Sequence, residues 1–266
     1  MNKLAFYLSL LKFSILHPKG GLNLINEANQ VHEDGNKKFN DFEFKPVISS
    51  QALQLIFGKA IEDDKNLKID DLKEHLDNFF KNISGDYPST SKPYPIDYSI
   101  LGESGPFLYK LCKILKPELI IETGVAYGVS SSYILKALHE NNKGKLISID
   151  SVFRPWQSKE MIGAAIPKNF RDRWELKIGT SKDLLENILK NFSSIDVFLH
   201  DSLHTYKNML FEFQKSWPFI KEGGFLLSDD LTSNNAFSDF CKSINKEPIT
   251  MIQENDPLSY LGILRK

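Results

Sequence analysis

The feature that most constrains this chain is a regular alternation of short apolar strands and helices, which begins near residue 105. Leu119, Ile120 and Ile121 form a continuous apolar run closed by Glu122 and Gly124, as is typical of a parallel strand buried on both faces. Further strands are predicted at 145–150, 174–178, 195–199 and 225–228, the last after a tight Gly223-Gly224 turn. Helices are predicted at 107–115, 130–139, 182–190, 205–219 and 234–244.

The last part of the chain departs from this alternation. Two strand-like runs, 248–253 and 260–264, are joined by a short turn around Asn255-Asp256-Pro257 that leaves no room for a helix. Runs connected in this way pair antiparallel. The sequence therefore predicts an α/β fold: a Rossmann-like, doubly wound, seven-stranded sheet with a terminal antiparallel hairpin. A ligand site is expected outside the carboxyl ends of its strands.

The first 95 residues follow a different pattern. Helices are predicted at 50–61 and at 67–80, where apolar residues return to one face at helical spacing. The segment 85–95 contains Pro88, Pro93 and Pro95, which favours a linker or a lid. We therefore expect a helical N-terminal region over 1–95, serving as a lid or an oligomer contact, and a ligand-binding domain over 96–266.

Composition limits the partners that this chain can have. With 266 residues and a formal net charge of −1, nothing indicates nucleic-acid binding. Cys112 and Cys241 have no metal-ligand spacing and fit buried thiols in a reducing cytoplasm. The apolar run 4–16 is interrupted by Lys12 and is shorter than the roughly 20 residues that span a bilayer. We expect an amphipathic helix, a cytoplasmic protein without stable membrane insertion, and a possible homodimer.

Acidic side chains gather at the expected ligand edge. Glu122, Asp150, Asp201, Asp229 and Asp230 each end or directly follow a predicted strand. Because the carboxyl ends of parallel strands meet at one edge of a sheet, these carboxylates should lie near one another. The sequence therefore predicts an acidic site at this edge.

Two glycines after the first strand predict a close approach of backbone to ligand. Gly124 and Gly128 can adopt a sharp turn that other residues resist. A dinucleotide-binding fingerprint needs glycines at its first, third and sixth positions. Here Ala126 stands at the third position and the last glycine comes one residue early, which disfavours a nicotinamide cofactor.

The spacing Glu122-x-Gly124-x-x-x-Gly128 resembles the first motif of class I S-adenosylmethionine-dependent methyltransferases. The resemblance covers about residues 105–266. It implies that Asp150 binds the ribose hydroxyls and that the segment 179–185 lies beside the adenine. The cofactor contacts that it implies are Glu122, Thr123, Gly124, Ala126, Tyr127, Gly128, Asp150, Ser181 and Asp201.

A narrower resemblance, to catechol-type and macrocin-type O-methyltransferases, concerns the chemistry. Asp201, Asp229 and Asp230 stand where those enzymes keep the ligands of a divalent metal. Carboxylate oxygens would favour Mg²⁺. The alternative is that these aspartates only cap the elements that follow them.

His204 lies three residues after Asp201, where catechol-type enzymes place a proton-accepting lysine. An imidazole can act as a general base at neutral pH. The resemblance therefore implies catalytic roles for His204 and Asp201, although His204 could equally orient the following helix. His200 is expected to be a packed core histidine.

The predicted function is S-adenosylmethionine-dependent O-methylation of a hydroxyl on a small molecule or sugar, assisted by a divalent metal. Two alternatives stay open at this point. One is a non-catalytic module that binds S-adenosylmethionine, and the other is a nucleotide-cofactor oxidoreductase on a related fold.

Overall fold

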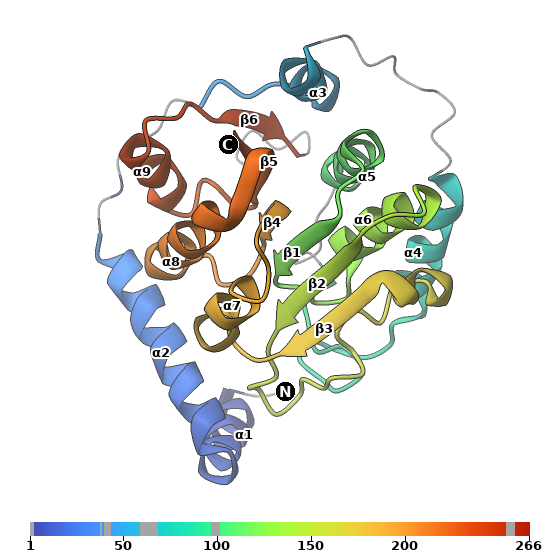
Figure 1. Ribbon diagram of the computed structural model, residues 1–266. Coiled ribbons are helices and arrows are strands. Elements are labelled where there is room, and N and C mark those ends of the chain that lie inside the picture. The colour runs from blue at the N-terminus through green and yellow to red at the C-terminus, as the bar shows by residue number, and fades with distance from the viewer. Residues whose placement is uncertain (1–2, 38, 40–43, 59–68, 97–101, 254–258) are drawn as a thin grey trace.

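A single seven-stranded sheet organises the chain, with helices on both of its faces (Figure 1). The computed structural model describes residues 3–37, 39, 44–58, 69–96, 102–253 and 259–266. The strands are β1 (Leu119–Thr123), β2 (Lys145–Asp150), β3 (Trp174–Ile178), β4 (Ile195–His200), β5 (Ile220–Ser228), β6 (Ile249–Ile252) and β7 (Tyr260–Arg265). Their order is β3-β2-β1-β4-β5-β7-β6, and only β7 runs antiparallel to its neighbours. This confirms the predicted doubly wound sheet with its terminal hairpin.

Strand β1 lies at the centre of the parallel part, where Ile121 pairs with Ile147 of β2 and Phe198 of β4. All five of its residues are buried, because helices cover both faces. Ile120 belongs to the core under α5 (Ser104–Leu115) and α6 (Val129–Glu140). Leu119 and Ile121 belong to the core under α7 (Ser181–Leu189), α8 (Tyr206–Ser216) and α9 (Ala236–Ser243).

Two predicted boundaries were wrong around β5. The expected tight turn at Gly223-Gly224 lies inside the strand, where Gly223 has a φ of +76° and the register with β4 shifts. A bulge therefore replaces the turn. The preceding helix ends at Ser216, and Trp217–Phe219 forms a 3₁₀ turn. Pro218, which has no N–H to donate, accounts for that early end.

The N-terminal region wraps around the sheet. Helix α3 (Ser49–Phe57) packs on β6 and α5, and α4 (Asp70–Asn82) packs on α6. Helix α3 ends before the predicted residue 61 because Gly58 adopts a left-handed C-cap with a φ of +69°. Residues 59–68, and the turn predicted at 255–257, lie outside the described residues. Val47 pairs with Met251 at the free edge of β6.

Side chains from both expected segments share one core. Leu53, Leu72 and Tyr94 pack in the same cluster as Ile120 and Phe107. The division of the chain at residue 95 stays a prediction, but the two sides are not separated by solvent.

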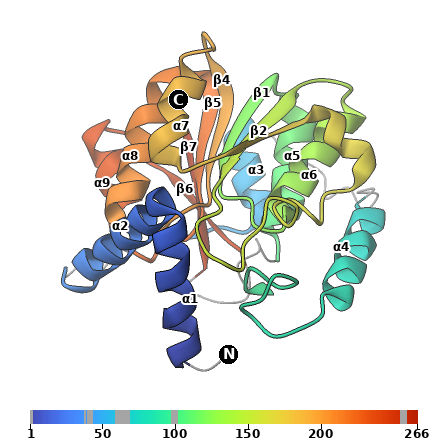
Figure 2. The ribbon, with the colours of Figure 1, turned by 90° about the horizontal axis from the view of Figure 1, so that it is seen from below.

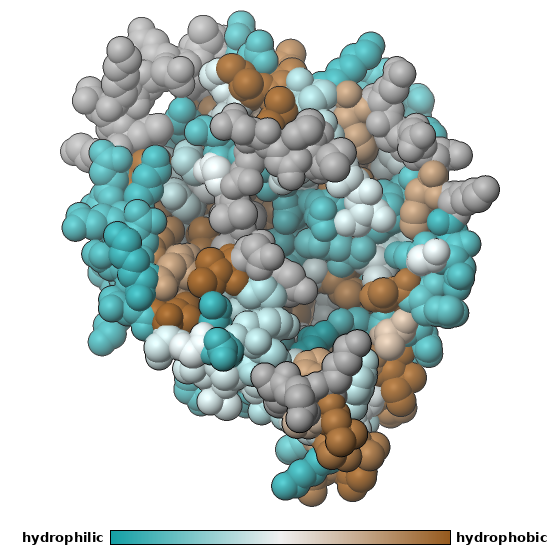
Figure 3. Space-filling view, turned by 180° about the vertical axis from the view of Figure 1, so that it is seen from behind, coloured by the Kyte–Doolittle hydropathy of each residue, from teal (hydrophilic) through white to brown (hydrophobic). Residues whose placement is uncertain are grey.

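Helices α1 (Lys3–Leu16) and α2 (Pro18–Gly35) form a hairpin that lies beside α8, on the opposite side of the molecule from α4 (Figure 2). The expectation of an amphipathic first helix was wrong, because the outward face of α1 is apolar too. Leu4, Leu8, Leu11 and Ile15 are all more than half exposed, and α1 forms a brown projection in Figure 3. Among the described helices, none has the length and hydropathy needed to cross a bilayer.

Candidate active site

The loop between β1 and α6 is held by the carboxylate of Asp150, at the end of β2. Oδ2 of Asp150 accepts hydrogen bonds from the backbone N–H groups of Val125 and Ala126, both at 2.9 Å. Oδ1 accepts a third from Ser151, at 2.6 Å. Burial raises the pKa of Asp150 above its ordinary value, and these three donors oppose that rise. A carboxylate offers about four acceptor positions, so one remains for a ligand hydroxyl.

Gly124 is required by a close approach between two loops. Its φ is +83°, and a Cβ there would lie 1.8 Å from the carbonyl oxygen of Asp201. The N–H of Asp201 in turn donates to the carbonyl of Thr123 at 2.8 Å. The close approach at Gly124 is therefore made to the loop after β4, and the predicted approach to a ligand stays a prediction. Gly128, with a φ of +89°, is crowded by Ile166.

The side chain of Glu122 lies behind this loop rather than at the rim. It is fully buried, and it accepts hydrogen bonds from the hydroxyls of Ser130 at 2.6 Å, Ser131 at 2.6 Å and Ser148 at 2.7 Å. Burial raises its pKa, against the lowering effect of the three hydroxyls. Glu122 was predicted as a cofactor contact, and the structure gives its side chain a supporting position instead.

Thr123 and Tyr127 were also predicted as cofactor contacts, and both side chains point into the core. The hydroxyl of Thr123 donates to Glu212 at 2.5 Å. Tyr127 is fully buried, with its ring packed against those of Phe79 and Phe80 on α4. The structure therefore directs both of these side chains away from the strand-end edge where the ligand was expected. Ala126 holds its part of the loop in a left-handed conformation, with a φ of +46°.

Ser181 begins α7, beside the end of β3, and its hydroxyl lies 3.3 Å from Oδ1 of Asn208 on α8. Asn208 also donates to Glu212 at 3.1 Å. Asn208 donates in addition to the carbonyl of Leu203 at 3.0 Å, so the predicted adenine-side segment is connected to the loop after β4.

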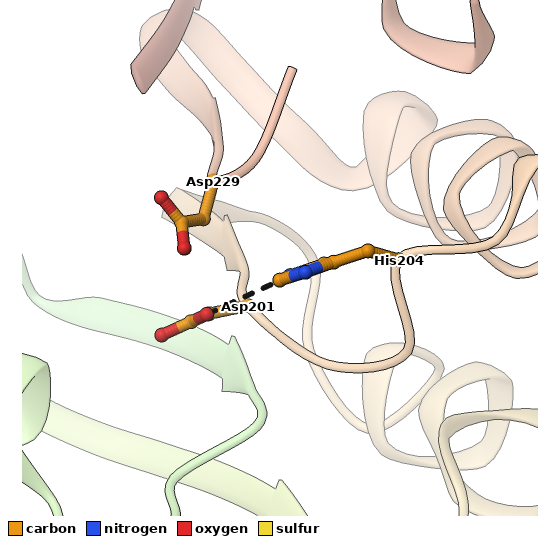
Figure 4. Close-up of side chains that lie close together, drawn as sticks. All are labelled: Asp201, His204 and Asp229. Carbon is orange, nitrogen blue, oxygen red and sulfur yellow. Dashed lines mark ion pairs between the residues drawn. The ribbon is translucent and has the colours of Figure 1, made fainter. Parts of the chain in front are cut away.

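Three groups meet at the ends of β4 and β5: Asp201, Asp229 and His204 (Figure 4). One ligand atom from each lies within 4.8 Å of the others. Nε2 of His204 lies 3.7 Å from Oδ1 of Asp201. It is buried and has no hydrogen-bond partner among the described residues. The cluster can therefore receive a cation or a proton.

Asp230 departs from the predicted metal ligand set. It has a φ of +55°, and its Oδ2 lies 3.0 Å from Nδ1 of His204 and 2.7 Å from the hydroxyl of Ser233. The structure thus brings Asp201 and Asp229 together as predicted, and it places His204, not Asp230, as the third group.

The charges in this cluster act strongly on one another. Burial, followed by the neighbouring carboxylate of Asp229, raises the pKa of Asp201 well above its ordinary value. Burial lowers the pKa of His204, but the hydrogen bond to Asp230 and the charge of Asp229 outweigh it and leave a net rise. The same hydrogen bond lowers the pKa of Asp230. The His204–Asp230 contact is therefore strongest as an imidazolium–carboxylate pair.

His200 is a packed core histidine, as expected. It is fully buried at the end of β4, and its Nδ1 lies 2.6 Å from Oε2 of Glu212. Glu212 is also fully buried and accepts from the hydroxyl of Ser202 at 2.8 Å. This network fixes the backbone from which Asp201 and His204 project.

Helix α2 lies along the same rim, a contact that the sequence analysis missed. Asp34 accepts from the backbone N–H of Tyr206 at 2.7 Å, at the start of α8. Gln30 accepts from the hydroxyl of Thr205 at 2.7 Å. Glu27 pairs with Arg154, which follows β2. The spacing of these α2 residues places them on one helix face, but their partners lie too far away in the chain to be recognised from sequence.

Comparison with known proteins agrees with this geometry. A protein-family model described as a methyltransferase domain matches residues 121–231, which include the loop after β1, Asp150 and the Asp201–Asp229 cluster. No curated protein sequence matches the chain.

Solved structures share the fold at low sequence identity. An O-methyltransferase from Bacillus cereus in complex with SAH has a TM-score of 0.54 at 15% identity, over 82% of this chain and 96% of that chain. An SAH-bound methyltransferase from Podospora anserina has a TM-score of 0.51 at 16% identity, over 74% and 88%. The O-methyltransferase of tomaymycin synthesis from Streptomyces achromogenes, in complex with SAM, has a TM-score of 0.51 at 13% identity, over 73% and 96%.

The family model covers the strand ends that carry the cluster. Residues 121–231 thus match a methyltransferase domain, and the chain shares its fold with methyltransferases solved in complex with SAH or SAM.

Proposed function

We propose that this protein transfers the methyl group of S-adenosylmethionine to a hydroxyl of a small molecule or sugar and releases S-adenosylhomocysteine. The observation that carries the proposal is the position of two sites at adjacent strand ends. The loop held by Asp150 contacts the loop of Asp201 directly, through the close approach at Gly124. A methyl donor on the first loop would therefore face a proton acceptor on the second.

The donor site is proposed at the loop after β1. Asp150 keeps one acceptor position free and would take a ribose hydroxyl there, a charge-assisted hydrogen bond. The backbone of residues 124–128 would hold the methionine part. When bound, S-adenosylmethionine supplies an electrophilic methyl group on its sulfonium sulfur. The protein's main task is then to align the acceptor oxygen with that carbon.

The acceptor's proton is proposed to go to His204. Asp230 holds Nδ1 at 3.0 Å, while Nε2, on the side of Asp201, has no hydrogen-bond partner among the described residues. An imidazole fixed by a carboxylate at one nitrogen is suited to act as a base at the other. As the O–CH₃ bond forms and the S–CH₃ bond breaks, Nε2 takes the hydroxyl proton, so the products are a methyl ether, S-adenosylhomocysteine and an imidazolium.

A divalent cation fits the same cluster. Asp229 lies so close to Asp201 that its carboxylate disfavours the charged form of Asp201, and a cation between them would remove that conflict. We propose Mg²⁺ on Asp201 and Asp229, where it would lower the pKa of the acceptor hydroxyl. Asp230 could join these ligands only by leaving His204. Imidazole ligation instead favours transition metals, so a preference for Zn²⁺ or Mn²⁺ over Mg²⁺ would indicate that His204 is a ligand.

Calorimetric titration with S-adenosylhomocysteine, and separately with NADH, tests the cofactor. We expect S-adenosylhomocysteine to bind and NADH not to bind. The Asp150→Ala variant should lose most of the affinity. Binding of NADH alone would favour an oxidoreductase and overturn the proposal.

Methyl transfer from labelled S-adenosylmethionine to a panel of sugars and phenols tests the reaction. Activity lost in EDTA and restored by Mg²⁺ would support the metal, whereas full activity in excess EDTA would remove it. Cofactor binding without transfer to any acceptor would favour the non-catalytic module.

Location and partners are proposed from the two cysteines, the surface of α1 and the net charge. Both cysteines are free and buried, which supports a reducing compartment and our assignment to the cytoplasm. The exposed apolar face of α1 supports a second copy of the chain as a partner. We propose no nucleic-acid partner, because the net charge is −1.

A further inference from the structure

The proline-rich segment before the methyltransferase domain is fastened to the loop after β1. The hydroxyl of Tyr127 donates to the carbonyl of Tyr94 at 2.9 Å, and the N–H of Tyr94 lies 3.4 Å from the same hydroxyl. The two rings pack edge to face, with centroids 5.3 Å apart. Tyr127 belongs to the loop proposed to hold the methyl donor, so Tyr94 is fixed against that loop from the N-terminal side.

Among the described residues, the hydroxyl of Tyr94 has no such partner. The residue is 6% exposed, and its Oη makes no hydrogen bond within the described part of the chain. A buried hydroxyl without a hydrogen-bond partner lowers the stability of the fold. A ligand that hydrogen-bonded to this hydroxyl would remove that cost.

The surroundings of this hydroxyl indicate where such a ligand lies. Burial, followed by the charge of Asp150, raises the pKa of Tyr94 above its ordinary value, while Arg154 opposes the rise. Asp150 ends β2, and Arg154 lies in the loop that follows it. Tyr94 thus packs on the loop after β1, and its hydroxyl is near enough to Asp150, the proposed ribose ligand, for that charge to act on it.

We infer that the hydroxyl of Tyr94 hydrogen-bonds to the ribose of bound S-adenosylmethionine, beside Asp150. The inference rests on the proposed function, because it needs the adenosyl ligand to occupy that edge. It makes the segment around residue 94 part of the donor site, so that this segment helps to position the ligand and does more than link two regions.

The Tyr94→Phe variant separates a ligand contact from a structural one. The variant removes only a hydroxyl that has no described partner, so its ligand-free melting temperature should equal or exceed that of the wild type. Its affinity for S-adenosylhomocysteine, measured by calorimetry, should fall on the order of tenfold, as for loss of one hydrogen bond at about 1–1.5 kcal/mol. Methylthioadenosine, which keeps the ribose and lacks the amino-acid end, should lose affinity by a similar factor.

Tyr127→Phe is the matched control. Its hydroxyl has described partners, so removing it should lower the ligand-free melting temperature. A Tyr94→Phe variant that binds both ligands as tightly as the wild type would overturn the inference, as would a loss confined to S-adenosylhomocysteine. A drop in its ligand-free melting temperature equal to that of Tyr127→Phe would also overturn it. Wild-type protein that binds neither ligand would instead refute the proposed function.

Discussion

Nδ1 of His204 lies 3.0 Å from Oδ2 of Asp230. This contact removes the Asp230 carboxylate from the ligand set suggested by its position after β5. It also leaves Nε2 of His204 directed toward the space beside Asp201. The pair therefore links two residues that the family resemblance treats separately, a metal ligand and a base.

Asp230→Asn should shift the pH dependence of catalysis. The hydrogen bond and charge of Asp230 raise the pKa of His204, so removing the charge lowers that pKa. A base acts in its deprotonated form, and the acidic limb of the kcat/KM profile should therefore move to lower pH. Methyl-transfer rates measured from pH 5 to 9 test this. His204→Ala should lower kcat on the order of 10²-fold. An unchanged limb in Asp230→Asn would argue against His204 as the base.

Asp201→Asn should stabilise the metal-free protein while abolishing activity. The folded protein holds the proton of Asp201 more tightly than the unfolded chain does, because the folded pKa is raised. The free energy of unfolding is therefore highest below the unfolded pKa and decreases as pH rises through the folded pKa. The variant should therefore gain most over the wild type at alkaline pH and little near pH 4. Melting curves in EDTA at pH 4 and pH 8 measure the difference. Equal gains at both pH values would contradict the assigned cause.

Glu212→Gln should destabilise the fold by about 2–4 kcal/mol at pH 7, because it disrupts a buried charged network. His200 and the hydrogen bonds to Glu212 lower its pKa despite burial. Because the pKa of Glu212 is lower in the folded than in the unfolded protein, its carboxylate stabilises the fold at pH values above the unfolded pKa. This stabilisation is lost as the pH falls through the folded pKa. Urea denaturation should show a smaller difference between variant and wild type at pH 4. Glu186→Gln, on the surface, should change stability far less than Glu212→Gln.

Gly124→Ala should disrupt both loops that form the site. The new Cβ would meet the carbonyl oxygen of Asp201 at 1.8 Å, and the φ of +83° disfavours alanine. We expect a loss of about 2–4 kcal/mol, or failure to fold. Gly35→Ala is the control, since its Cβ would meet no atom within 4 Å. Chemical denaturation of both variants gives the comparison, and equal stabilities would show that the two loops can separate without penalty.

Asp34→Ala should loosen the attachment of α2. Asp34 supplies the acceptor for the N–H of Tyr206 at the start of α8, a capping contact worth about 1 kcal/mol. Hydrogen exchange should accelerate in α2 and in the first turn of α8, while the sheet stays protected. Glu33→Ala, at the exposed neighbouring position, should leave exchange unchanged. Faster exchange in both variants would assign the effect to helix propensity.

The sheet could be predicted because its signals are local. Leu119, Ile120 and Ile121 had to be buried on both sides, and the two cores of the structure receive them alternately. The bulge at Gly223 escaped prediction because a Gly-Gly pair reads as a turn in isolation, and only pairing with β4 shows that the strand continues through it.

The site was only partly predictable. The sequence could place three acidic residues at one edge, because each ends or follows a strand and the carboxyl ends of parallel strands meet there. These residues are Asp150, Asp201 and Asp229. The contact of Asp230 with His204 depends on a left-handed backbone at residue 230, and aspartate gives no clear local signal for that conformation. Tyr94 lies in a proline-rich segment without periodicity, so only the folded chain shows that it touches Tyr127.

The polar attachment of α2 has a consequence for how this protein could diversify. Glu27, Gln30 and Asp34 hold the first helices to the rim through side-chain contacts with Arg154, Thr205 and Tyr206, while the sheet core lies beneath. Exchanging the helical hairpin for another would change what fits above the rim and leave the chemistry below it intact. We expect related proteins that methylate other acceptors to differ in the first 35 residues. They should keep the proposed donor site, which is the loop after β1 together with Asp150.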